Sequence, residues 1–95
     1  MSEHRPAVSG HDEAAGRFTI ELDGHRAELD YLLEGGVMRI THTGVPAAIG
    51  GRGVAGNLVR NALEFARAHG YKVQPDCSYA QDWFGRHPEH RDLLA

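Results

Sequence analysis

The sequence predicts a single small α/β domain, in which an antiparallel three-strand meander is followed by a β-α-β unit and a C-terminal helix. Two patterns predict it. Before residue 45, apolar side chains alternate with polar ones in three successive runs, which is the period of half-buried strands. After residue 53 they recur at helical spacing. With 95 residues, one Trp, three Tyr and three Phe, the chain is long enough for one domain and too short for two.

The N-terminal stretch MSEHRPAVSGHDEAA, residues 1–15, is polar and shows no periodicity. We expect it to form a flexible tail, as is common at a chain terminus. The domain itself is then expected to span residues 16–95.

The alternating runs predict strands that are joined by tight turns, since DG and EGG are turn signals. In the third run, VMRITHT, the alternation places His42 on the same face as Met38 and Ile40. The predicted strands are residues 18–22, 27–33 and 37–43, with turns at 23–24 and 34–36.

An amphipathic helix is predicted from Val54, because apolar residues recur at helical spacing up to Ala66 and Gly70 follows as a C-terminal stop. The run YKVQP, residues 71–75, then predicts a fourth strand. A crossover between neighbouring parallel strands is right-handed in nearly all proteins. The β-α-β unit therefore brings the helix start and the carboxyl ends of both strands to one end of the sheet, where open sheets bind ligands.

A second helix is predicted after the fourth strand. Ser78 and Gln81 have the spacing of a capping box, so this helix is expected to begin at Cys77 or Ser78. Cys77 would then lie both at a strand end and at a helix N-terminus.

The stretch IGGRGVAGNL contains a GxGxxG pattern at Gly51, Gly53 and Gly56. Amides of a first helical turn attract anions, and the side chain of Arg52 adds a charged contact. The pattern alone is weak evidence for a dinucleotide site, which needs a strand directly before the turn and a larger sheet. The stretch does not fit a nucleotide-phosphate loop either, because the Lys and the Ser or Thr that follow the second glycine of such a loop are absent here.

The charge, the apolar runs and the histidine spacing of the sequence argue against nucleic acid, membrane and metal as binding partners. The formal net charge is −3, with 13 acidic and 10 basic residues scattered along the chain, so we expect no nucleic-acid binding. No apolar run approaches a membrane span, and the N-terminus lacks a signal-peptide core, so a cytoplasmic protein without a membrane partner is expected. His87 and His90 lack further ligands at suitable spacing, so no metal is expected.

Four motifs in this order resemble the small GCN5-related N-acetyltransferases, the single-domain subgroup with a PxCSY motif. The resemblance covers about residues 16–95 and implies the fold of that family, acetyl-coenzyme A as co-substrate and an amine as acceptor. The motifs are HTGVP (42–46), GGRGVAGNLVRNALEFARAHGYKV (50–73), PDCSY (75–79) and RHPEHRDLL (86–94).

The resemblance also implies roles for individual residues. The backbone N–H near Val45 would polarise the thioester carbonyl, and two parallel strands would splay apart around the pantetheine arm. Tyr79 is a candidate to protonate the departing thiolate, since Trp83 and Phe84 occupy the stretch where larger relatives have a tyrosine. The positions implied to hold the pyrophosphate are Gly50, Gly51, Arg52, Gly53, Val54, Ala55 and Gly56.

Two positions depart from the family pattern. Gly50 stands where Arg or Gln is usual, so a side-chain phosphate contact is lost. Gly44 stands where Glu is common in the subgroup, so a carboxylate that would serve as a base is missing. The general base is therefore not identified by the motifs.

Cys77 and His42 are the candidate catalytic residues. A thiol at a helix N-terminus is favoured as thiolate, and Cys77 would accept the acetyl group and pass it to the amine. His42 would take a proton from the amine or from Cys77. Each residue also has a structural interpretation: Cys77 as a small buried apolar residue, and His42 as a histidine that ends an apolar strand face.

The expected function is acetyl transfer to a small amine, a polyamine or a protein lysine. A module that binds coenzyme A or a nucleotide without turnover is the alternative, and a plain interaction domain is a third interpretation. A monomer or weak homodimer is expected, because an exposed strand edge is able to pair with another copy.

Overall fold

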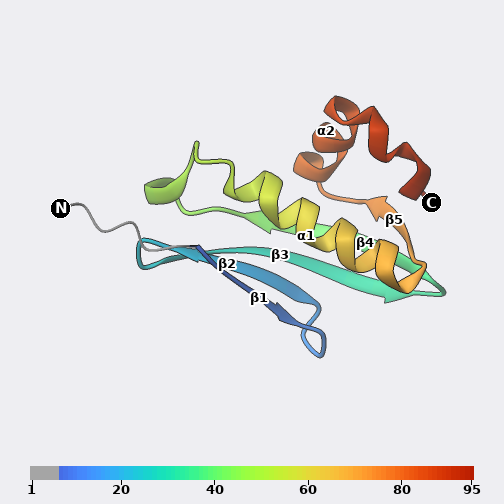
Figure 1. Cartoon of the computed structure of the whole chain (residues 1–95), viewed down its shortest axis with the longest axis horizontal. Helices are drawn as coiled ribbons and strands as arrows, with labels where there is room; N and C mark the ends of the chain where they lie inside the picture. The colour runs from blue at the N-terminus through green and yellow to red at the C-terminus, as the bar shows by residue number, and fades with distance from the viewer. Residues whose placement is uncertain (1–6) are drawn as a thin grey trace.

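The computed structural model describes residues 7–95. They form one five-stranded sheet in the order β1-β2-β3-β4-β5, with both α-helices on the same face (Figure 1). The predicted α/β class is confirmed. The strands are β1 (Val8–Asp12), β2 (Arg17–Leu22), β3 (His25–Glu34), β4 (Val37–Gly44) and β5 (Lys72–Pro75), the helices α1 (Val54–His69) and α2 (Ser78–Arg86), and the 3₁₀ turns η1 (Ala47–Ile49) and η2 (Pro88–Leu93).

Strand β1 corrects the prediction of a tail over residues 1–15. Residues 8–12 pair antiparallel with β2 along their whole length, so the meander has four strands instead of three. This segment has no apolar period. The His11 ring lies on that of Phe18 with 3.8 Å between ring centroids, and this stacking attaches the strand to the core. Residues 1–6 of the predicted tail lie outside the described residues.

The predicted β-α-β unit is confirmed, because β5 pairs with β4 in parallel, from Val37 opposite Lys72 to Ile40 opposite Pro75. Helix α1 connects the two strands and packs against β2, β3, β4 and β5. It ends where predicted, since Gly70 takes a positive φ of 71° at the C-cap, a conformation that favours glycine.

A bulge interrupts the pairing of β3 with β4. Tyr31 lies opposite Ile40, whereas the preceding residue Asp30 lies opposite His42, so Thr41 has no opposite residue. One extra residue in a strand moves every later side chain to the other face.

The bulge overturns the prediction that His42 shares the face of Met38 and Ile40. Those two side chains are fully buried, whereas the His42 side chain is 55% exposed. The next residue, Thr43, lies opposite the buried Leu29 and takes the inward place instead. Alternation in the sequence cannot reveal a bulge, because a residue is extra only in relation to the residues of the neighbouring strand with which its own strand pairs.

The core lies between the sheet and the two helices. The α1 stripe of Leu58, Val59, Ala62 and Leu63 is buried there, as the helical spacing predicts. Trp83 of α2 is the largest fully buried side chain. No helix of the described part of the chain is long and apolar enough to cross a membrane.

Candidate functional site

The pairing of the parallel strands β4 and β5 stops before β4 ends. Strand β5 ends at Pro75, opposite Ile40, while β4 continues to Gly44. The amides of Asp76 and Cys77 both donate to the Ile40 carbonyl, at 2.9 and 3.1 Å, and close the paired region. Beyond this point β4 leads to the glycine turn, and the segment after β5 leads into α2.

The glycine turn before α1 presents unpaired amides. Gly51 and Gly53 have φ of 76° and 75°, a region that favours glycine. The first helical hydrogen bond runs from the Asn57 amide to the Gly53 carbonyl at 3.1 Å, so the amides before Asn57 have no partner within the helix. Gly53 makes no side-chain cap and the first turn holds no acidic residue. The N-terminus of α1 is therefore a suitable place for an anion.

A cavity of about 260 Å³ lies between the glycine turn, the end of β4 and helix α2. Every residue that the sequence analysis predicts to bind the coenzyme lines this cavity, except Arg52. Its lining consists of Val45, Ile49, Gly50, Gly51, Gly53, Val54, Ala55, Gly56, Tyr79 and Arg86.

The arginine that lines the cavity is Arg86 and not the predicted Arg52. Arg52 pairs with Asp23 in the turn between β2 and β3, and it is absent from the cavity lining. Arg86, in the last turn of α2, lines the cavity, and no ion pair is found for it among residues 7–95. Arg86 begins the RHPEHRDLL motif, but no sequence pattern assigned it a role at the cavity, because only the packing of α2 beside α1 brings it to the glycine turn.

Helix α2 also brings Tyr79 to the first turn of α1. A β-carbon built on Gly56 would lie 3.7 Å from the Tyr79 hydroxyl and 3.6 Å from Trp83 Nε1. Trp83 is buried, whereas Tyr79 is half-buried and lines the cavity. Of these two groups, the Tyr79 hydroxyl is the proton donor that reaches the cavity.

Cys77 is the N-cap of α2. Its Sγ accepts a hydrogen bond from the Ala80 amide at 3.4 Å and lies 3.5 Å from Thr43 Oγ1. The predicted start of this helix is thus confirmed, but its N-cap side chain is that of Cys77 instead of Ser78. Ser78 is the first helical residue, and the Gln81 side chain bonds the carbonyl of the residue before the cap at 3.4 Å. The half-buried Cys77 thiol lies next to Thr43, just beyond the point where β4 and β5 stop pairing, and is absent from the cavity lining.

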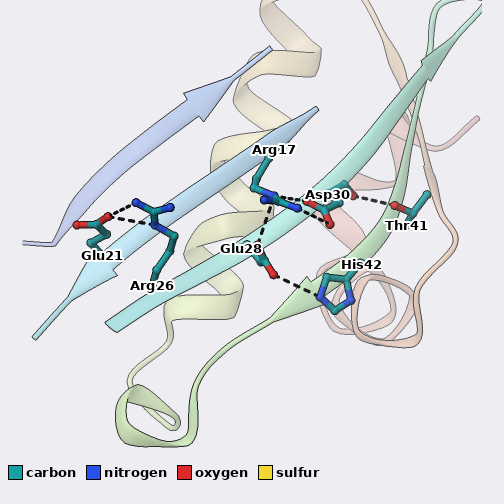
Figure 2. A network of polar contacts seen from close by, with 7 residues as sticks. All are labelled: Arg17, Glu21, Arg26, Glu28, Asp30, Thr41 and His42. Carbon is teal, nitrogen blue, oxygen red and sulfur yellow. Dashed lines mark hydrogen bonds and ion pairs between the residues drawn. The ribbon is translucent and has the colours of Figure 1, made fainter. Parts of the chain in front are cut away.

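His42 lies on the opposite face of the sheet from the helices, in a row of charged side chains (Figure 2). Its Nε2 is 4.0 Å from Glu28 Oε1. Arg17 Nε contacts both Glu28, at 3.3 Å, and Asp30, at 2.7 Å. The hydrogen bond that Arg17 Nε donates to the Asp30 carboxylate is the largest cause that raises the pKa of Arg17, so this guanidinium stays charged. The structure therefore brings His42 and Cys77 to different faces of β4.

No group of three potential metal ligands is found in the described part of the chain. The His87 ring stacks on Trp83 with 4.0 Å between centroids, and its Nδ1 lies 2.8 Å from the Trp83 carbonyl oxygen. His90 Nδ1 lies 3.3 Å from an Arg67 nitrogen. These contacts give both histidines structural roles.

Comparisons with known proteins agree on one family. Residues 17–93 match the family model described as GCN5-related N-acetyl-transferase. Protein NATD1 of Gallus gallus is 36% identical over 86 residues, which cover 87% of this chain and 78% of that protein. Protein NATD1 of Mus musculus is 35% identical over 91 residues, with 93% and 83% covered.

The fold agrees with a solved structure. The NMR solution structure of a GCN5-like protein from Staphylococcus aureus superposes with a TM-score of 0.71 at 26% sequence identity. The match covers 95% of this chain and 87% of that one.

Proposed function

Because the chain belongs to the GCN5-related N-acetyltransferase family, we propose that it transfers the acetyl group of acetyl-coenzyme A to a primary amine. The observation that carries the proposal is the cavity between the glycine turn and α2. Its lining contains eight of the nine residues that the sequence predicts for the coenzyme, namely Val45, Gly50, Gly51, Gly53, Val54, Ala55, Gly56 and Tyr79.

The cavity suits an anionic pyrophosphate. Unpaired amides before Asn57 supply hydrogen-bond donors, and the first turn of α1 has no acidic side chain to repel a phosphate. Arg86 adds a positive charge at the wall formed by α2. The gap between β4 and β5 would admit the pantetheine arm, which places the thioester near Val45.

Transfer then needs three groups around the thioester. The Val45 amide would donate to the carbonyl oxygen as it becomes an oxyanion. The neutral amine attacks the carbonyl carbon, the carbon–nitrogen bond forms, and the carbon–sulfur bond breaks. Tyr79 would give its proton to the departing thiolate, the attacking nitrogen would lose a proton to solvent as the amide forms, and solvent would return a proton to Tyr79. Positioning of two aligned reactants alone supplies about 7–11 kcal/mol in intramolecular reactions.

Cys77 defines a second route to the same products. The thiolate attacks the thioester, coenzyme A leaves as its thiol, and the acetyl group is held as a new thioester on Cys77. The amine then attacks that thioester and releases the Cys77 thiol. The position of Sγ at the strand gap, bonded to the Ala80 amide and beside Thr43, supports this route.

The test combines calorimetry of acetyl-coenzyme A with chromatographic detection of free coenzyme A and acetylated amine. We expect micromolar binding, about −8 kcal/mol, and no binding of NADH. Gly56→Val would place a branched side chain beside the Tyr79 hydroxyl and is expected to weaken binding at least tenfold. Gly85→Ala is the matched control, because no atom lies within 4 Å of the added β-carbon.

The outcomes separate the interpretations. Binding with no acetylated product would leave a module that binds coenzyme A without turnover. Absence of binding would overturn the proposal and favour an interaction domain. An acetyl adduct on Cys77 in the intact mass, removed by added amine, would establish the covalent route. Full turnover by Cys77→Ala would exclude that route.

A further inference from the structure

The face of the sheet that carries His42 is open. Both α-helices pack on the other face, and no helix of the described residues covers this one (Figure 1). If the coenzyme arm fills the gap between β4 and β5 from the helix side, an amine has free access only from the open face. This step rests on the proposed function.

His42 stands at that open end of β4 because Gly44 has no side chain. A β-carbon built on Gly44 would lie 3.0 Å from His42 Nε2 and 3.5 Å from its Cε1. The imidazole thus occupies the space that a side chain at position 44 would take. Gly44 directly precedes Val45, whose amide would donate to the thioester carbonyl in the proposed function.

Glu28 of the neighbouring strand is the carboxylate beside the imidazole. It lies opposite Gly44 in the β3–β4 register, and its Oε1 is 4.0 Å from His42 Nε2 (Figure 2). Its other oxygen contacts Arg17 Nε at 3.3 Å, and Asp30 holds the same guanidinium. The groups that face His42 are therefore Glu28 and Asp30 of β3, of which Asp30 lies directly opposite it in the register, and Arg17 of β2 contacts both carboxylates.

We propose that this open face is the acceptor side of the site, where His42 is the proton acceptor for the incoming amine and Glu28 positions the imidazole. The acceptor is a primary ammonium, which loses one proton to a ring nitrogen of His42. The lone pair of the neutral amine then attacks the thioester carbonyl from the open face. Glu28 balances the positive charge that His42 gains, and solvent removes the proton after product leaves.

The test measures kcat and KM with acetyl-coenzyme A and three acceptors: 1,3-diaminopropane, spermidine and lysine with a blocked α-amine. His42→Ala is expected to lower kcat about a hundredfold, as loss of a general base does. The KM for acetyl-coenzyme A should not change, because the cavity lies on the other face. Added imidazole should restore part of kcat in this variant.

Two further variants separate positioning from folding. Glu28→Gln is expected to lower kcat about tenfold and Glu28→Asp less, with circular dichroism and melting temperature close to wild type. Gly44→Ala should displace the ring and lower kcat as His42→Ala does, but without rescue by imidazole, because the ring is still present. His69→Ala, an exposed histidine at the far end of α1, is the control for loss of a histidine.

The possible results distinguish the two proposals. Wild-type turnover with an unchanged kcat in His42→Ala would overturn this inference and leave the proposed function intact. Equal losses of coenzyme binding and kcat in His42→Ala would also overturn it, since they indicate a structural role. Absence of turnover by the wild-type protein with all three amines would overturn both.

Discussion

At the scale of single residues, Arg86 and Arg52 show how charge is distributed around the cavity. Arg52 follows the glycines directly, yet its guanidinium pairs with Asp23 on the hairpin. Arg86 lies more than thirty positions later and lines the cavity. A phosphate near the glycine turn therefore meets one side-chain cation from α2 together with the amides of α1.

Arg86→Gln is expected to weaken acetyl-coenzyme A binding about tenfold, since a hydrogen bond to a charged group contributes about 1.5 kcal/mol. Calorimetry at low and high salt measures this loss, which should be smaller at high salt. Arg60→Gln, on the exposed side of α1, is the matched control. Equal effects of the two changes would contradict a direct contact of Arg86 with the coenzyme.

At the scale of elements, the turn η2 and the residues after it secure the outer edge of β5. Val73 and Leu94 form an isolated parallel bridge, and the Ala95 amide donates to the Val73 carbonyl at 2.9 Å. Leu93 is buried against the core with 5% of its surface exposed. The Lys72 ammonium donates to the Asp92 carbonyl at 2.7 Å. These contacts hold β5 on the side that does not pair with β4.

Leu93→Ala is expected to lower the free energy of unfolding by about 2–4 kcal/mol, as for other buried leucines. Leu33→Ala is the matched control, because Leu33 is 45% exposed and surface changes stay within about 0.5 kcal/mol. Urea titration followed by circular dichroism gives both values. Similar losses for the two variants would show that η2 adds little to the stability of the domain.

At the scale of the whole molecule, His11 links β1 to the rest of the domain. Its ring lies against Phe18 and Phe65, and its Nε2 is 2.5 Å from the Tyr31 hydroxyl. Although much of the residue is exposed, burial against these rings lowers the pKa of His11 below 6.5, and the charges of Glu13 and Asp12 oppose the shift. Strand β1 is also the free edge of the sheet, so a monomer or weak homodimer stays a prediction.

Because the pKa of His11 is lowered, the free energy of unfolding is expected to fall as the pH drops below 6.5. A lowered pKa means that the unfolded chain binds the His11 proton more readily than the folded chain does, so stability rises with pH between the folded value and 6.5. Melting temperatures of the wild type and His11→Phe across that range measure the effect. The variant keeps an aromatic ring and should show a shallower slope. An unchanged slope would refute the role of His11.

Much of the fold could be predicted from local signals. The helical spacing from Val54 and the stop at Gly70 coincide with α1, and the YKVQP run contains β5. Strand β1 could not be predicted, because its residues have no apolar period and are held by the pairing with β2 and by the His11 stack. The glycine motif and the family resemblance singled out eight residues that line the cavity, but they also named Arg52, which does not line it, and gave no role to Arg86.

The sequence by itself determined the class of the domain, the β-α-β unit and the glycine turn, because each depends on residues that are near one another in the chain. The tertiary structure decided which side chains meet across elements. Thr41 is an extra residue only in relation to β3, and that bulge turns His42 to the open face and Thr43 towards Cys77. Such contacts join residues far apart in the chain, so they depend on strand register and helix packing, which no local pattern contains.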